Sequence, residues 1–164
     1  MSTRGLFGFK TKKDTYLCFS PSDSYPAGMG KHWYKIVREY NLKHMEKVLD
    51  EIPSIDIINE GTGTNLEKDI ASSLNISEEE AKKALEEYDN IYNESDAGIF
   101  DSINLGELDF FVNEKDFARD TLFCEWIYYY DYEKKMFVII NNQSGRQHEI
   151  SLTQNNWQEF FKML

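Results

Sequence analysis

The chain has little cysteine, little proline and no long hydrophobic run. Its 164 residues include two cysteines and three prolines. Cys18 and Cys124 each lie in an apolar run, the usual setting of reduced buried thiols, so we expect no disulfide. No apolar stretch reaches the roughly 20 residues of a membrane span, and the N-terminus lacks the hydrophobic segment of a signal peptide. We therefore expect a cytoplasmic protein with no membrane partner.

Positive charge is scarce as well. The chain has 18 basic and 29 acidic residues, a net charge of −11. A non-specific nucleic-acid binder needs a basic face, so we expect no such activity. The acidic excess is concentrated in residues 46–101, with four basic and sixteen acidic side chains, whereas residues 1–45 carry eight basic and three acidic ones. Such a segment is usually a solvated helical face, and the alternative is mimicry of a nucleic-acid backbone that occupies a basic groove.

Motifs for metals and cofactors are missing. The histidines have no third ligand at a zinc-type spacing, and residues 93–101, which we read as a loop, do not match a calcium-binding pattern. Residues 59–65 contain two glycines but lack both the Lys-Ser/Thr of a phosphate-binding loop and the third glycine of a dinucleotide fold. The sequence thus predicts no metal and no cofactor.

Hydrophobic and aromatic residues are plentiful, at 41% and 15%. This composition predicts one globular domain over residues 1–164, with a core built largely of rings. Two pairs of β-branched or aromatic runs, each joined by a short polar turn, predict two β-hairpins. The first pair is Arg4–Lys10 with Thr15–Phe19, and the second is Leu122–Tyr130 with Met136–Ile140.

Apolar residues at helical spacing, together with capping boxes at Thr64-Asn65-Leu66-Glu67 and Ser77-Glu78-Glu79-Glu80, predict helices between and after the hairpins. The expected ranges are 32–40, 45–52, 65–74, 78–92 and 155–163. We therefore predict an α+β fold in which both hairpins contribute to one antiparallel sheet, packed with about five helices. The acidic helical segment, about residues 60–95, is inserted between the hairpins, and Trp126 is placed on the buried face of the second one.

We place the candidate site in the loop between the first hairpin and the first helix. Pro21 and Pro26 restrict its backbone, and Gly28 and Gly30 permit a tight reversal. The predicted binding residues are Arg4, Asp23, Ser24, Tyr25 and Glu125. We expect Arg4 and Asp23 to lie in contact, with Tyr25 beside them. The alternatives are a plain strand-to-helix connection, or a buried polar network that only locks the hairpins together.

Three motifs carry a resemblance to a known group of proteins. They are Thr3-Arg4-Gly5, Asp23-Ser24-Tyr25-Pro26 followed by Gly28 and Gly30, and Phe123-Cys124-Glu125-Trp126-Ile127-Tyr128. This set resembles short uncharacterised proteins that are common in bacteriophage and prophage genomes. The resemblance covers both ends of the chain but not its acidic middle. It brings no known activity and implies a mobile-element origin, where small acidic proteins often bind and block a host protein.

Two functions follow as expectations. The first is a small acidic binding or inhibitory module acting on a host protein, such as one with a basic groove, because no complete catalytic constellation is evident and tyrosine and tryptophan are frequent. The second is an N-terminal-nucleophile-like hydrolase. In that reading, removal of Met1 exposes Ser2 as the nucleophile, while Arg4 and Asp23 act as orienting or oxyanion-stabilising groups. We favour the first and keep the hydrolase as the alternative.

Overall fold

The computed structural model describes residues 3–57, 65–95 and 97–164. Its strands are β1 (Gly5–Lys10), β2 (Thr15–Ser20), β3 (Ser54–Asp56), β4 (Phe111–Asn113), β5 (Trp126–Asp131), β6 (Met136–Asn141) and β7 (Arg146–Ile150). Its α-helices are α1 (Lys31–Glu39), α2 (Leu42–Glu51), α3 (Leu66–Leu74), α4 (Glu78–Glu94), α5 (Gly98–Asn104) and α6 (Trp157–Lys162). A π-helical turn, η1 (Pro26–Gly30), precedes α1, and a 3-10 helix, η2 (Lys115–Arg119), follows β4.

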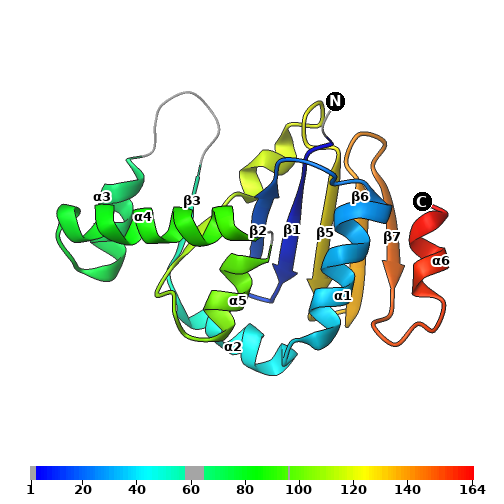
Figure 1. Ribbon diagram of the computed structural model, residues 1–164, viewed down its shortest axis with the longest axis horizontal. Coiled ribbons are helices and arrows are strands. Elements are labelled where there is room, and N and C mark those ends of the chain that lie inside the picture. Colours follow the sequence, from blue (N-terminus) through cyan, green and yellow to red (C-terminus); the bar gives the residue numbers. More distant parts are fainter. Residues whose placement is uncertain (1–2, 58–64, 96) are drawn as a thin grey trace.

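Five strands form the main sheet, in the order β2-β1-β5-β6-β7 (Figure 1). The predicted hairpins are β1-β2 and β5-β6, and they join through β1 and β5, so the α+β prediction is confirmed. The β1-β5 pair is parallel, while the other three neighbouring pairs are antiparallel. The sheet therefore joins the two hairpins, far apart in the sequence, at its centre. The short strands β3 and β4 pair separately, also in parallel.

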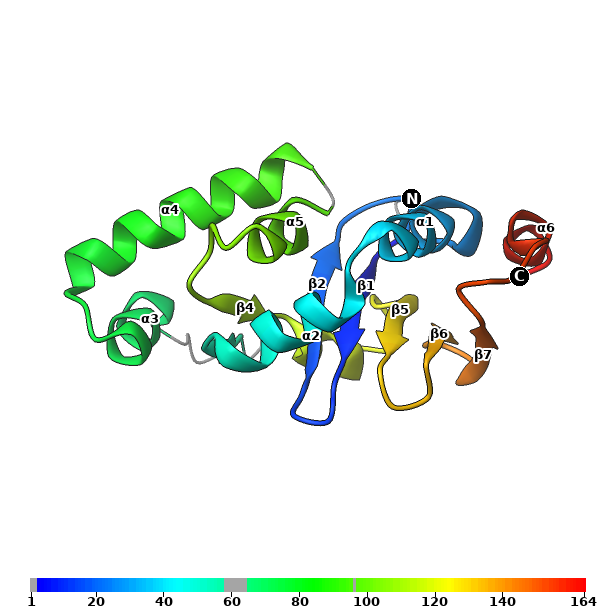
Figure 2. The ribbon, with the colours of Figure 1, turned by 90° about the horizontal axis from the view of Figure 1, so that it is seen from below.

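Helices α1, α2, α5 and α6 cover one face of this sheet (Figure 2). Trp33 of α1 is fully buried at the centre of this layer, and its Nε1 donates to the backbone oxygen of Gly8 at 3.1 Å. The Trp33 ring lies 5.0 Å from that of Phe7 and 5.3 Å from that of Phe9, the inward-facing residues of β1. Phe100 of α5 completes the cluster at 5.1 Å from Trp33. Phe7 and Phe9, on one face of β1, thus pack against a helix from each half of the chain.

The other face of the sheet has a smaller apolar cluster. Leu6, Leu17, Cys124 and Ile127 are buried there, and Phe117 of η2 packs against them. Both cysteines of the chain are free, as the sequence predicts. Among the helices of the described ranges, none is both long enough and apolar enough to span a membrane.

Several local predictions are wrong in the structure. Residues 93–101 are not a loop, because α4 continues to Glu94 and α5 begins at Gly98. The second hairpin starts at Trp126 rather than Leu122, and β7 adds a strand that the sequence pattern did not predict, since Arg146–Ile150 is mostly polar. Trp126 faces the helical layer but is only half-buried, stacked on Tyr128 at a centroid distance of 6.3 Å.

Candidate functional site: a groove between the proline loop and helix α4

The proline loop is fixed to the sheet through Ser24. This residue is fully buried, and its backbone N–H donates to the oxygen of Thr3 at 3.2 Å. Its hydroxyl donates to the oxygen of Ser20 at 3.2 Å, and its own carbonyl accepts from the hydroxyl of Tyr128 at 2.6 Å. Every polar group of Ser24 is therefore occupied within the protein. It anchors the loop, and its side chain does not reach solvent.

Asp23 and Tyr25 lie on the outside of the same loop, and both side chains are exposed. Asp23 has a φ of 54°, in the left-handed region, and its backbone oxygen accepts from the N–H of Met29 at 2.8 Å. A Cβ on Gly28 would come within 2.4 Å of that oxygen, so the reversal requires glycine there. The tight turn holds the Asp23 side chain outward.

Arg4 and Glu125 are brought together by the backbone. The N–H of Glu125 donates to the oxygen of Arg4 at 2.9 Å, next to the parallel β1-β5 pair. The Arg4 guanidinium lies over the ring of Phe123, 5.5 Å from its centroid. Among the described ion pairs none joins Arg4 to Asp23, and the predicted contact between these two stays a prediction. Ser2, the nucleophile of the alternative hypothesis, lies outside the described residues, and that prediction stays a prediction.

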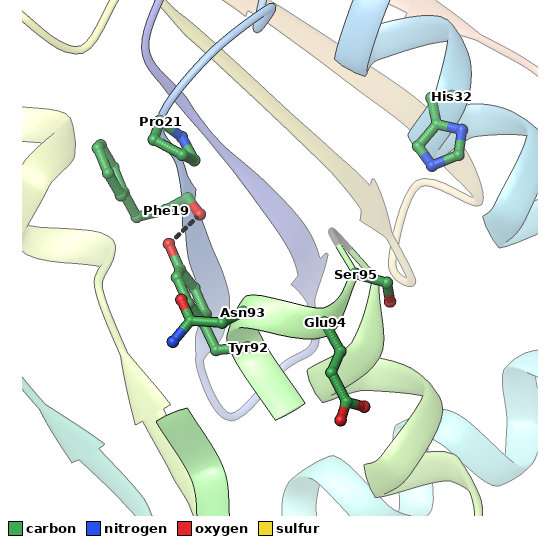
Figure 3. Close-up of a pocket in the computed structure, with 7 residues that line it drawn as sticks. All are labelled: Phe19, Pro21, His32, Tyr92, Asn93, Glu94 and Ser95. Atoms are coloured by element: carbon green, nitrogen blue, oxygen red, sulfur yellow. Dashed lines mark hydrogen bonds between the residues drawn. The ribbon is translucent and has the colours of Figure 1, made fainter. Parts of the chain in front are cut away.

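The outer edge of β2 is closed by side chains from elsewhere in the fold. The amide of Asn113 accepts from the N–H of Leu17 at 3.2 Å and donates to the oxygen of Thr15 at 2.8 Å. Further along the strand, the carboxylate of Glu114 accepts from the N–H of Phe19. The hydroxyl of Tyr92 donates to the oxygen of Phe19 at 2.7 Å (Figure 3). The edge is thereby protected from pairing with another chain.

A groove runs beside this closed edge, between the proline loop and the C-terminal half of α4. It consists of three adjoining hollows that share lining residues. A loop pocket of about 190 Å³ is lined by Ser22, Asp23, Gly28, Met29 and His32. A central pocket of about 400 Å³ is lined by Phe19, Pro21, His32, Tyr92, Asn93, Glu94 and Ser95 (Figure 3). An apolar pocket of about 310 Å³ is lined by Phe19, Ile57, Leu66, Leu85, Tyr88, Asp89, Tyr92, Val112 and Glu114.

Two carboxyl groups face the apolar pocket. Burial raises the pKa of Glu114 to about 7, with a further contribution from the negative charge of Asp89, while the Phe19 N–H opposes the shift. Asp89 is exposed at the pocket's rim, and its partial burial also raises its pKa. A carboxyl group that titrates near neutral pH in an apolar hollow is a typical feature of a binding or catalytic site.

Lys115, the cation next to Glu114 in the sequence, forms ion pairs with other carboxylates than Glu114 and Asp89. The ammonium of Lys115 lies 2.6 Å from Asp14 and 3.7 Å from Asp56. Among the residues with described positions, no group of three or more His, Cys, Asp or Glu is arranged to hold a metal ion. The groove therefore offers carboxylates and aromatic walls.

Of the predicted site residues, Asp23 lines the groove directly. Tyr25 lies beside Gly28, Ser24 is an internal anchor, and Arg4 and Glu125 belong to the β1-β5 junction. The sequence reasoning missed Glu114 and Tyr92. The polar pair Asn113-Glu114, placed directly after the apolar run 110–112, is a signal that could have indicated buried polar groups.

Comparison of the chain with protein-family models, with curated proteins and with solved structures gives no match.

Proposed function

We propose that this protein is a small acidic binding module that recognises a basic surface of another protein. The recognition surface consists of an acidic lobe, defined as α3 and α4 with their connection (residues 65–95), and the groove at its base. The lobe carries nine acidic and three basic side chains. None of these side chains takes part in an ion pair among those described, and this observation carries the proposal.

The position of the lobe supports this function. Helices α3 and α4 extend beyond the β2 edge of the sheet, away from α1 and α6 (Figures 1 and 2). Most of the lobe's carboxylates are exposed, including Glu79, Glu86 and Glu87. Anionic charge concentrated on one projection steers a basic partner and sets its orientation. The groove adds aromatic and apolar surface that a partner can bury, which contributes to affinity. Charge alone mainly increases the rate at which the partners meet.

The proposal extends to biological role. The resemblance of both chain ends to phage and prophage proteins supports a mobile-element origin, and it supports inhibition of a host protein in the cytoplasm as the outcome of binding. The chain's overall charge of −11 favours a basic partner over nucleic acid or an anionic lipid surface.

Partner capture from a bacterial lysate tests the proposal. The wild type is compared with the double variant Glu86→Gln/Glu87→Gln in the lobe and with Glu39→Gln/Glu133→Gln, which removes the same charge from exposed sites elsewhere. We expect one salt-sensitive partner that the lobe variant loses and the control variant retains. A partner captured equally by all three proteins would contradict the role of the lobe.

The hydrolase hypothesis is separated by a different measurement. Sequencing the mature N-terminus and treating the protein with a serine-directed acylating probe reports whether Ser2 is exposed and reactive. A binding module gives no specific labelling and no dependence on residue 2.

A further inference from the structure

The apolar pocket differs from the rest of the groove in its lining. It is lined by Phe19 at the end of β2, Leu85 and Tyr88 of α4, and Val112 of β4, together with Ile57 and Leu66. The hydroxyl of Tyr88 is engaged, since it accepts from the N–H of Val112 at 3.0 Å. At about 310 Å³, the pocket is large enough for one long side chain and too small for a folded element.

The carboxyl groups that line the pocket belong to Glu114 and Asp89. Glu114 lies within it and Asp89 lies at its rim, and each carboxyl is disfavoured in its charged form by burial. The other ionisable groups around it, Tyr88, Tyr92 and the thiol of Cys18, contribute no positive charge. Lys115 is directed to Asp14 and Asp56 instead. Within the described residues, the pocket thus has negative charge and apolar walls but no cation.

We propose that the apolar pocket receives a lysine or arginine side chain of the partner protein. The methylene groups of such a side chain pack against Leu85 and Val112, and its cationic end meets Glu114 and Asp89. This inference rests on the proposed function, because it names the residue type by which the basic partner is anchored. Charge complementarity selects this occupant, since an anionic or neutral side chain leaves both carboxyls without a counter-charge.

The test uses side-chain analogues and the whole protein. In two-dimensional NMR, n-butylammonium and n-propylguanidinium represent lysine and arginine, and n-butanol is the neutral control of matched length. At pH 8 we expect saturable shifts of the Phe19 amide and the methyl groups of Leu85 and Val112, with the cations binding about tenfold more tightly than butanol. Lowering the pH to 5.5 should weaken cation binding, because Glu114 becomes protonated.

Two variants locate the effect. Glu114→Gln keeps an oxygen that accepts the Phe19 N–H and should abolish the preference for cations. Asp89→Asn should weaken that preference without abolishing it. Glu79→Gln removes the same charge from an exposed position of α4 and should leave the preference unchanged. Equal binding of butanol and butylammonium, or cation-induced shifts only on the exposed face of the lobe, would overturn the inference.

The analogues need no partner, so their result is independent of the capture experiment. If the proposed function is wrong, no partner is captured, while binding of the analogues still reports on the pocket. If the analogues bind but Glu114→Gln captures the partner as well as the wild type does, the assignment of the pocket to a partner side chain is overturned.

Discussion

The side-chain oxygen of Asn113 accepts the backbone N–H of Leu17 at 3.2 Å, between residues 96 positions apart in the sequence. The backbone oxygen of Asn113 accepts from Ile57 at 3.0 Å beside the small β3-β4 sheet, so this one buried residue joins the two sheets. Its side-chain amide hydrogen-bonds the β2 edge where the backbone of a further strand would otherwise pair. Glu114, the next residue, lines the groove beside this contact.

We therefore expect Asn113→Leu to destabilise the protein. The substitution leaves the N–H of Leu17 and the oxygen of Thr15 without partners, at a cost of about 2–4 kcal/mol in the free energy of unfolding. Urea denaturation measures the change. Asn90→Leu on the exposed face of α4 is the control, with an expected change within about 0.5 kcal/mol. Similar midpoints for both variants would contradict this role of Asn113.

Trp33 of α1 and Trp126 of β5, both on the helical side of the sheet, should differ in importance. Trp33 is fully buried and bonded to Gly8, so Trp33→Ala should cost about 3–5 kcal/mol. Trp126 is half-buried and mainly stacks on Tyr128, so Trp126→Ala should cost about 1–2 kcal/mol. Thermal and urea unfolding of both variants check the order. A larger loss for Trp126→Ala would show that the register of β5 is wrong.

Double-mutant cycles distinguish the contacts of Arg4. Its guanidinium lies over Phe123, and an exposed cation–π contact gives a coupling energy of about 0.5–1 kcal/mol. The cycle of Arg4→Ala with Asp23→Ala should give a coupling within about 0.5 kcal/mol of zero, because these two do not form an ion pair. Strong coupling between Arg4 and Asp23 would support the contact predicted from the sequence.

Glu114 should make stability depend on pH. Its pKa is about 7 in the folded protein, against an ordinary value of 4.5, so the folded state retains a proton that the unfolded state loses. The contribution of this group is fully present below pH 4.5 and is lost as the pH rises through about 7. As the pH rises from 4.5 to 8, the free energy of unfolding of Glu114→Gln should therefore rise by about 2–3 kcal/mol relative to that of the wild type.

Denaturant titrations at several pH values measure that gain. Glu79→Gln, at an exposed position on α4, should follow the wild type across the range. A difference between Glu114→Gln and the wild type that does not change with pH would show that the carboxyl has an ordinary pKa.

The sequence by itself determined most of the elements. Runs of β-branched and aromatic residues specified the strands of both hairpins, and helical spacing specified α1, α2, α4 and α6, because these patterns arise from local geometry. The start of α4 was also determined by local sequence, as a capping box. The hydroxyl of Ser77 accepts from the N–H of Glu80 at 3.1 Å and donates to the Glu80 carboxylate at 3.0 Å. Loop chemistry identified the tight turn that contains Asp23.

Only the tertiary structure decided how these elements meet. The parallel pairing of β1 with β5 joins segments from opposite ends of the chain, and no short-range pattern encodes it. The groups that close the β2 edge, Asn113, Glu114 and Tyr92, are ordinary polar residues in the sequence. Their roles come from burial beside unpaired backbone groups, which depends on contacts across the fold. The acidic charge was visible in the sequence, but the apolar pocket beneath it is formed by packing α4 against β2 and β4.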